Sequence, residues 1–158
     1  MSASLNRCCR SVVLLLAFFS CAQSPPNEAR VRRVIDGDTV QLENGQLVRY
    51  AGIDTPEVRR RKGDGWVEAP EPYARAATQE NRSLVEGLVV RLEYDVQSVD
   101  RFGRLLAYVY RGDLMVNAEL LRRGLAQPMT IPPNVRHAEM FRLLAEEARR
   151  NKRGLWDH

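Results

Sequence analysis

The sequence predicts one α+β domain that is mainly β: a five-stranded OB-type barrel with about three appended helices. Three short strand patterns follow one another between residues 30 and 53, separated by turn signals. A helical pattern at 73–86 comes next, followed by two more strand patterns at 88–95 and 104–111. A helix inserted after the third of five short strands is typical of this barrel.

Turn residues define the first three strands. Asp36-Gly37 ends the first strand, and Asn44-Gly45 is a strong two-residue hairpin signal between the second and third strands. The expected strands are RVRRVI (30–35), TVQLE (39–43) and QLVRYAGI (46–53).

The rest of the chain is expected to be loop and helix. DTPEVRRRKGDGWVEAPEP (54–72) reads as a long loop, and loops of this length in compact domains are usually functional. Further helices are expected near 117–124 and from about Val135 to Arg153, with Asn134 and Gly154 at the cap positions of the last helix.

The first 22 residues are expected to be a secretory signal rather than part of the fold. Arg7 and Arg10 precede an apolar run that is too short to span a bilayer, and Ser20-Cys21-Ala22 fits a small-x-small cleavage site. A cut before Cys21 with lipid on that cysteine is the alternative. The protein is therefore expected to be secreted or periplasmic, or else a membrane-anchored lipoprotein, with a linker at 23–29 and the domain at 30–158.

Composition excludes several kinds of chemistry. All three cysteines (Cys8, Cys9 and Cys21) lie in or beside the signal, so thiol catalysis and a disulfide framework are not expected in the mature domain. His137 and His158 are the only histidines, which is too few for a zinc site. Without Arg7 and Arg10 the formal charge falls from +4 to +2, so net charge alone does not indicate a polyanionic partner.

Two aspartates and an arginine stand out in the strand region. Asp38 and Asp54 each lie at a strand end where a meander can bring them side by side, and paired carboxylates suit Ca²⁺ or Mg²⁺. Common turn chemistry explains each aspartate equally well on its own. Arg49 either shares an inward face with Leu47, in which case it needs an anionic partner, or points outward while Val48 and Tyr50 point inward.

Four motifs in order resemble the staphylococcal nuclease (thermonuclease) family over about residues 30–157. They are VIDGDTVQLENGQLVRYAGIDTPE (34–57), DRFGRLLAYVY (100–110), MVNAELLRRGLA (115–126) and the terminal GLWD (154–157). The resemblance implies an OB-fold barrel and a monomeric Ca²⁺-dependent phosphodiesterase. That enzyme would act on DNA and RNA without an obligate protein partner, cleaving the P–O5′ bond and leaving 3′-phosphate ends.

The resemblance also implies residue roles. Asp38 and Asp54 would be calcium ligands, together with the backbone carbonyl of Thr55. Glu57 would be the base or water-orienting carboxylate, and Arg49 and Arg104 would hold the phosphate.

The sequence departs from the best-known family members at three pocket positions. Phe102, Thr130 and Pro132 stand where those members have tyrosines, so we expect weaker or differently selective substrate binding. The alternative function is a catalytically inactive OB-fold module that binds nucleic acid. Depleted stacking aromatics beside a complete catalytic set favour the enzyme.

Overall fold

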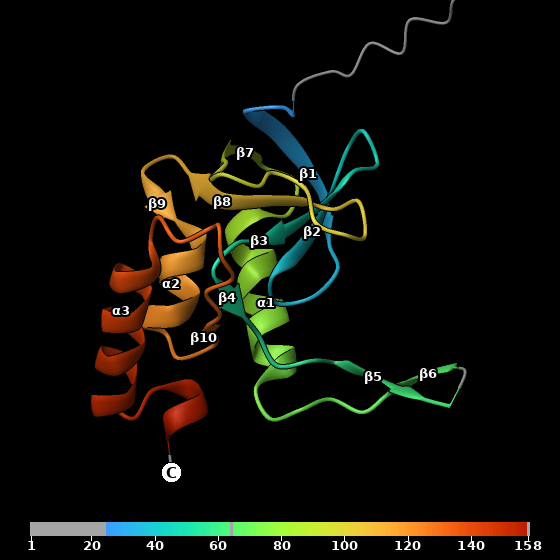
Figure 1. Cartoon of the computed structure of the whole chain (residues 1–158). Helices are drawn as coiled ribbons and strands as arrows, with labels where there is room; N and C mark the ends of the chain where they lie inside the picture. Colours follow the sequence, from blue (N-terminus) through green and yellow to red (C-terminus); the bar gives the residue numbers. More distant parts are fainter. Residues whose placement is uncertain (1–24, 64, 158) are drawn as a thin grey trace, which may run out of the picture.

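A closed barrel forms the body of the protein in the computed structural model, which describes residues 25–63 and 65–157. The sheet has the order β3-β2-β1-β7-β8-β9, and β3 also pairs in parallel with β8, which closes it (Figure 1). The predicted α+β barrel is thereby confirmed. The strands are β1 (Glu28–Val34), β2 (Thr39–Leu42), β3 (Leu47–Tyr50), β7 (Val89–Glu93), β8 (Leu105–Arg111) and β9 (Leu114–Met115). The expected signal at 1–22, including the site at Cys21, lies outside the described residues.

The β2–β3 hairpin sets the relation between two strand ends. Gly45 adopts φ +88°, a conformation that glycine accepts without steric cost and that the tight turn requires. The resulting register pairs Thr39 with Arg49, and the amide of Tyr50 bonds the carbonyl of Asp38 at 2.8 Å. The hairpin therefore places the start of β2 beside the end of β3.

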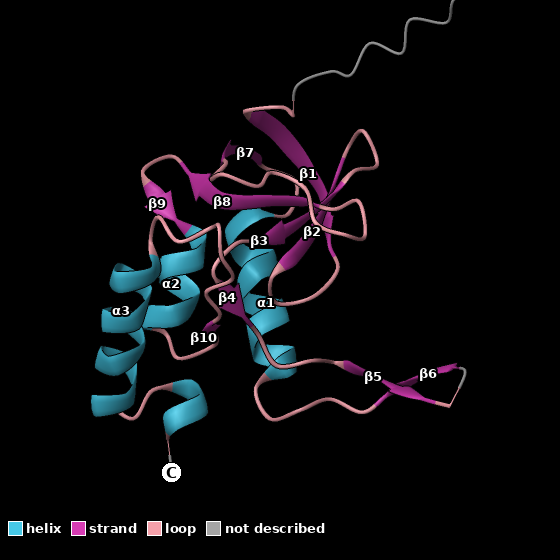
Figure 2. Ribbon diagram, in the orientation of Figure 1, coloured by secondary structure: helices cyan, strands magenta, loops and turns pink. Residues whose placement is uncertain are grey.

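Three helices pack beside the barrel, and a terminal 3₁₀ turn packs against the third helix and the end of the second (Figure 2). They are α1 (Ala74–Val85), α2 (Val116–Arg122), α3 (Ala138–Arg150) and η1 (Gly154–Trp156). The last helix is shorter than predicted at both ends. Its N-cap is His137 rather than Asn134, and it ends before Lys152, which adopts a left-handed φ of 50°.

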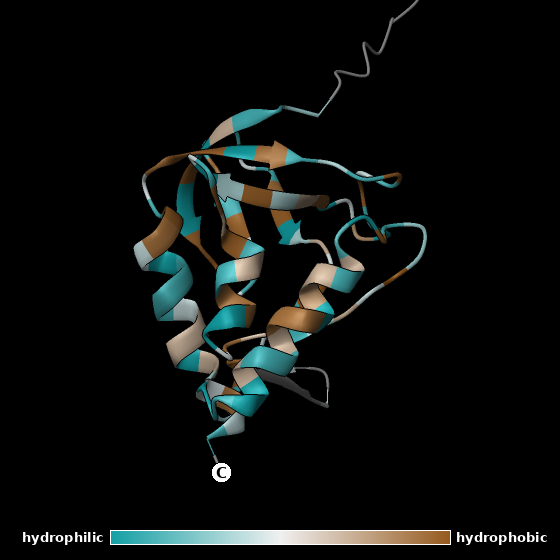
Figure 3. Cartoon of the chain, turned by 90° about the vertical axis from the view of Figure 1, so that its left-hand side faces the viewer, coloured by the Kyte–Doolittle hydropathy of each residue, from teal (hydrophilic) through white to brown (hydrophobic). Residues whose placement is uncertain are grey.

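Apolar side chains of the barrel strands and of the helices pack into one hydrophobic core. Apolar and polar residues alternate along the strands and around the helices (Figure 3). Tyr50, Tyr108 and Phe141 are the largest fully buried side chains. They join β3, β8 and α3, so the core holds the strand that carries Arg49 against the helical layer.

The expectation of a long loop at 54–72 is wrong, because this segment contains strands. Strand structure continues through β4 (Ile53–Asp54), which pairs with β10 (Gln127–Pro128). A second hairpin follows, formed by β5 (Arg59–Lys62) and β6 (Gly65–Glu68), and it projects away from the barrel (Figures 1 and 2). In the described part of the chain, no helix combines the length and apolar character needed to cross a bilayer.

Candidate active site

Asp38 is a buried carboxylate at the start of β2. Its Oδ2 accepts hydrogen bonds from the backbone N–H of Thr55 at 2.8 Å and from the hydroxyl of Thr55 at 3.0 Å. Its Oδ1 accepts the hydroxyl of Thr39 at 3.2 Å. Three neutral donors therefore fix the orientation of this carboxylate and stabilise its charged form.

Glycine at position 37 lets the β1–β2 turn reach Thr55. A Cβ atom there would lie 2.5 Å from the Thr55 hydroxyl and 2.9 Å from the Cβ of Ala77. No side chain fits in that space without displacing its neighbours. Gly37 is therefore required for the contact between Asp38 and Thr55.

Arg49 joins the two predicted metal-binding carboxylates. Its Nη2 lies 2.6 Å from Asp54 Oδ1, and its Nη1 forms an ion pair with Asp38 Oδ1. Val48 and Tyr50 are buried in the core, so the outward-facing alternative for Arg49 is correct. Its side chain is nevertheless only 12% exposed, because the two aspartates enclose it. Paired charges of this kind are how proteins accommodate a buried guanidinium.

The donors at this point suit a hard cation. Asp38 and Asp54 present carboxylate oxygens at one place, and the Asp54 side chain is 51% exposed and open to solvent. Thr55 is adjacent in the chain and offers its backbone carbonyl. Oxygen donors of this kind fit Ca²⁺ or Mg²⁺ better than zinc. Among the described residues there is no cluster of three or more His, Cys, Asp or Glu side chains able to hold a metal.

Glu57 lies beside this cluster, on the segment that follows β4. Its backbone is held by Glu71 through two hydrogen bonds: Glu57 N–H to Glu71 Oε2 at 3.2 Å, and Glu71 N–H to Glu57 O at 2.9 Å. Partial burial raises the pKa of the Glu57 carboxyl, and the negative charges of Asp36 and Asp54 add to this, while Arg49 opposes it. A carboxylate with a raised pKa is a better proton acceptor.

Asp36 is a site carboxylate to which the sequence assigned no role. Its Oδ1 accepts the N–H of Asp38 at 3.1 Å, and burial raises the pKa of the Asp36 carboxyl, against the effects of Thr39 and Arg49. The Asp36-Gly37-Asp38 motif is itself visible in the sequence. Interpreted only as a turn signal, the motif gives no reason to expect that the Asp36 carboxyl lies near Glu57.

Arg104 is oriented by Asp100 within a tight turn. Asp100 Oδ1 accepts the backbone N–H groups of Phe102 at 2.8 Å and Arg104 at 3.0 Å, while Oδ2 lies 2.7 Å from Arg104 Nε. Gly103 completes the turn with φ +78°. The guanidinium is thereby directed by a carboxylate that the sequence had not singled out as a site residue.

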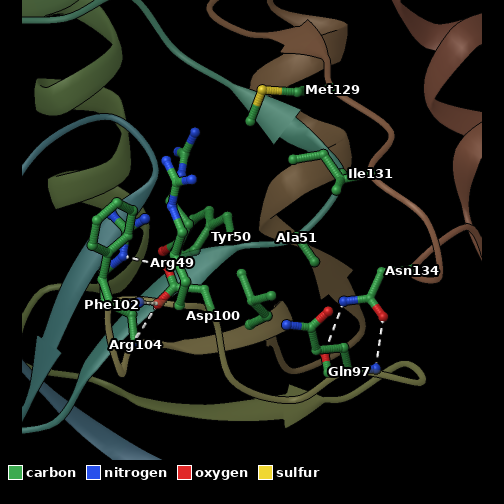
Figure 4. Close-up of a pocket in the computed structure, with 13 residues that line it drawn as sticks. Arg49, Tyr50, Ala51, Gln97, Asp100, Phe102, Arg104, Met129, Ile131 and Asn134 are labelled. Atoms are coloured by element: carbon green, nitrogen blue, oxygen red, sulfur yellow. Dashed lines mark hydrogen bonds and ion pairs between the residues drawn. The ribbon is translucent and has the colours of Figure 1, made fainter.

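Arg49 and Arg104 line the same cavity, of about 510 Å³ (Figure 4). Phe102, whose side chain is 69% exposed, stands at this cavity with the Arg104 guanidinium 5.5 Å from its ring centroid. Met129 and Ile131 line the cavity, whereas Thr130 and Pro132, the positions expected from the family pattern, are not among its lining residues. The cavity thus combines three arginines (Arg101 is the third) and one aspartate with apolar walls, which suits a nucleotide.

The structure brings the predicted site residues together, and Arg104 lines the same cavity as Arg49 (Figure 4). Asp38, Arg49, Asp54 and Thr55 are in direct contact. Glu57 is linked to them electrostatically. Two cations, a fixed carboxylate pair and a proton acceptor are the groups that hydrolysis of a phosphodiester requires.

Comparison with known proteins agrees with this geometry. The family described as Staphylococcal nuclease homologue matches residues 47–158. The chain is similar to the thermonuclease of Staphylococcus intermedius, at 37% identity over 130 residues covering 80% of this chain and 74% of the relative. The thermonuclease of Staphylococcus hyicus is 35% identical over 146 residues, covering 89% and 83%. Endonuclease YncB of Bacillus subtilis (strain 168) is 37% identical over 129 residues, which is 78% of this chain and 59% of that relative. On these matches the chain belongs to the staphylococcal nuclease homologue family.

Proposed function

We propose that this protein is an exported, monomeric, Ca²⁺-dependent nuclease that hydrolyses phosphodiester bonds of DNA and RNA at P–O5′ and leaves 3′-phosphates. The observation that carries the proposal is the ion-paired unit of Asp38, Arg49 and Asp54 beside Glu57, with Arg104 on the same cavity. Relatives named thermonuclease and endonuclease support it. Export rests on the sequence pattern of residues 1–22 alone.

The two arginines bind the reacting phosphate. Arg49 exchanges part of its carboxylate pairing for a phosphate oxygen, and Arg104, held at Nε by Asp100, has its terminal nitrogens left for a second oxygen. Both guanidinium groups are cationic donors, so they stabilise the negative charge that builds up on the phosphate. Removing one such donor typically costs 10²- to 10³-fold in kcat, on the order of 3 to 4 kcal/mol.

The carboxylates divide between metal binding and proton transfer. Asp38, Asp54 and the Thr55 carbonyl would hold Ca²⁺, which supplies charge neutralisation and orients the phosphate and the water. Glu57 accepts the proton of the attacking water. Its raised pKa favours this role, since a general base contributes roughly 10²- to 10⁴-fold when it is positioned and sufficiently basic.

The test is degradation of single-stranded DNA and RNA by the purified protein, with millimolar Ca²⁺ or with a chelator. Glu57→Gln removes the proton acceptor and keeps the shape, and we expect it to lower kcat at least 10²-fold. Glu43→Gln, an exposed carboxylate at the other end of β2, is the matched control and should retain activity. A folded protein that binds the strand but leaves it intact in Ca²⁺, Mg²⁺ and Mn²⁺ would refute the enzyme and favour the inactive binding module.

A further inference from the structure

A second hollow, of about 470 Å³, lies next to Glu57 and shares no lining residue with the cavity of Arg49 and Arg104. Asp36 and Glu57 are its acidic lining residues. Arg49 lines the first cavity and pairs with Asp38, whose backbone N–H bonds Asp36 in the lining of the second hollow, so the proposed catalytic cluster borders both hollows. The first cavity accommodates one side of a phosphodiester, which leaves the other side without an assigned binding surface.

One polar face of α1 contributes four of the eight residues that line this second hollow. Arg75, Thr78, Gln79 and Arg82 follow at steps of three and four residues and therefore share one helix face. The two arginines are seven residues apart, about 10 Å along the helix axis. The opposite face of α1 already supplies the core, through side chains such as Ala77 and Leu84. Packing of the helix therefore does not account for the two arginines.

Both arginines can be redirected to a ligand. Arg75 pairs with Glu68 at 2.7 Å and Arg82 pairs with Glu86 at 3.4 Å, and all four side chains are substantially exposed to solvent. Exposed pairs of this kind contribute at most about 1 kcal/mol, so a phosphate can replace the carboxylate partner.

The remaining walls fit a nucleotide strand as well. Ile35 and Val58 supply apolar surface for sugars and bases, and Ile35 is partly exposed as the fold stands. Two acidic residues, Asp36 and Glu57, line the hollow and equal the two arginines in number. Asp36 Oδ1 already accepts the backbone N–H of Asp38 at 3.1 Å.

We propose that this α1 groove, lined by Arg75, Thr78, Gln79 and Arg82, binds the nucleotides on the far side of the scissile phosphate from the Phe102 cavity. A single strand then lies across the site with both flanks bound, and the enzyme cuts internal bonds instead of trimming ends. The inference rests on the proposed nuclease function and adds a substrate-binding surface to it.

The experiment compares two substrates and one double variant. Arg75→Gln with Arg82→Gln is assayed on a single-stranded oligonucleotide of about ten nucleotides and on a chromogenic phosphodiester that carries a single nucleoside. Arg91→Gln is the matched control: Arg91 is 46% exposed against 47% for Arg82 and has a similarly distant glutamate partner, but it lies on β7 outside the groove.

The proposed binding in the groove predicts that the effect of the double variant on kcat/KM depends on substrate length. For the double variant, we expect kcat/KM on the oligonucleotide to fall at least tenfold, with a twofold change or less on the single-nucleoside substrate. The slope of log(kcat/KM) against log[salt] should become shallower by about 0.7 for each phosphate that the variant no longer neutralises. The control should match the wild type in both respects.

The possible results test the proposed groove and the proposed nuclease activity separately. Equal decreases on both substrates, or an unchanged salt slope on the oligonucleotide, would overturn the groove while leaving the activity established. If the wild type cleaves neither substrate, the proposed function itself fails. An internally cut circular single strand, with the double variant strongly impaired on it, supports the groove; efficient cutting of the circle by the double variant counts against it.

Discussion

Asp38 and Asp54 pair with the same guanidinium, but we expect their replacement to lower the free energy of unfolding by very different amounts. The comparison is Asp38→Asn against Asp54→Asn, two isosteric changes that each remove one negative charge. Both residues pair with Arg49, but the Asp38 side chain is 6% exposed and the Asp54 side chain is 51% exposed. The two variants therefore isolate the effect of burial on one shared ion pair.

The magnitudes follow from the hydrogen bonds and ion pairs of each carboxylate. Asp38 uses one oxygen for two donors of Thr55 and the other for Arg49 and Thr39. An asparagine must turn its NH₂ group toward one of these donor sets, so at least one charge-assisted or buried bond is broken, at about 2 to 3 kcal/mol. Asp54 is open to water, and its replacement should cost at most about 1 kcal/mol.

Urea unfolding in the presence of a chelator measures this difference without ligand stabilisation. We expect the free energy of unfolding of Asp38→Asn to lie at least 1 kcal/mol below that of Asp54→Asn, with unchanged m-values. Both variants should nonetheless lose nuclease activity to a similar degree, because each removes one proposed metal ligand. Equal destabilisation by the two changes would refute the conclusion that Asp38 is the buried anchor of Arg49.

Two further predictions concern substrate binding and pH. Phe102→Ala should raise KM on single-stranded DNA about tenfold, as expected for removal of one stacking surface, while the unfolding free energy stays within about 0.5 kcal/mol of the wild type. Phe102→Tyr is the conservative control. An unchanged KM in Phe102→Ala would show that Phe102 is not part of the binding surface. Burial disfavours the charged form of Asp95, yet the N–H of Arg136 and the hydroxyl of Tyr108 hold the pKa of Asp95 below its ordinary value of 3.8. Its stabilising effect is therefore present above pH 3.8 and is lost as the pH falls through the lowered pKa, so Asp95→Asn should destabilise the protein at pH 7 and less so in acid. Denaturation at several pH values checks this, and a destabilisation that does not vary with pH would contradict it.

The sequence is most informative where local chemistry decides the conformation. Asn44-Gly45 can form a tight hairpin almost regardless of context, so the first three strands are found where predicted, although the third ends at Tyr50 and not at Ile53. The hairpin β5–β6 escapes prediction because Arg59–Lys62 is uniformly cationic and has no apolar alternation to mark a strand. The predicted start of the last helix is three residues early, since its N-cap at His137 has no side-chain capping bond that a motif could reveal.

The site is predictable as a set of residues but not as an arrangement. The strand and turn pattern singles out Asp38, Arg49 and Asp54, and the family resemblance assigns their roles, but strand periodicity leaves the direction of Arg49 open. The answer depends on barrel closure: β3 pairs with β8 on its free edge, and the core takes Val48 and Tyr50. Contacts so distant in sequence leave no local signal.

Arg49 links substrate binding to the state of both carboxylates. In the structure its guanidinium neutralises Asp38 and Asp54, which would otherwise repel each other and any phosphate that approaches. When a phosphate oxygen takes up part of that guanidinium, the two carboxylates lose compensating charge and their attraction for a divalent cation rises. Phosphate and cation should therefore bind with positive coupling through this one side chain, and by linkage each should raise the affinity of the other by the same factor. Under the proposed function, Arg49 would connect the metal site to the substrate as well as bind the phosphate.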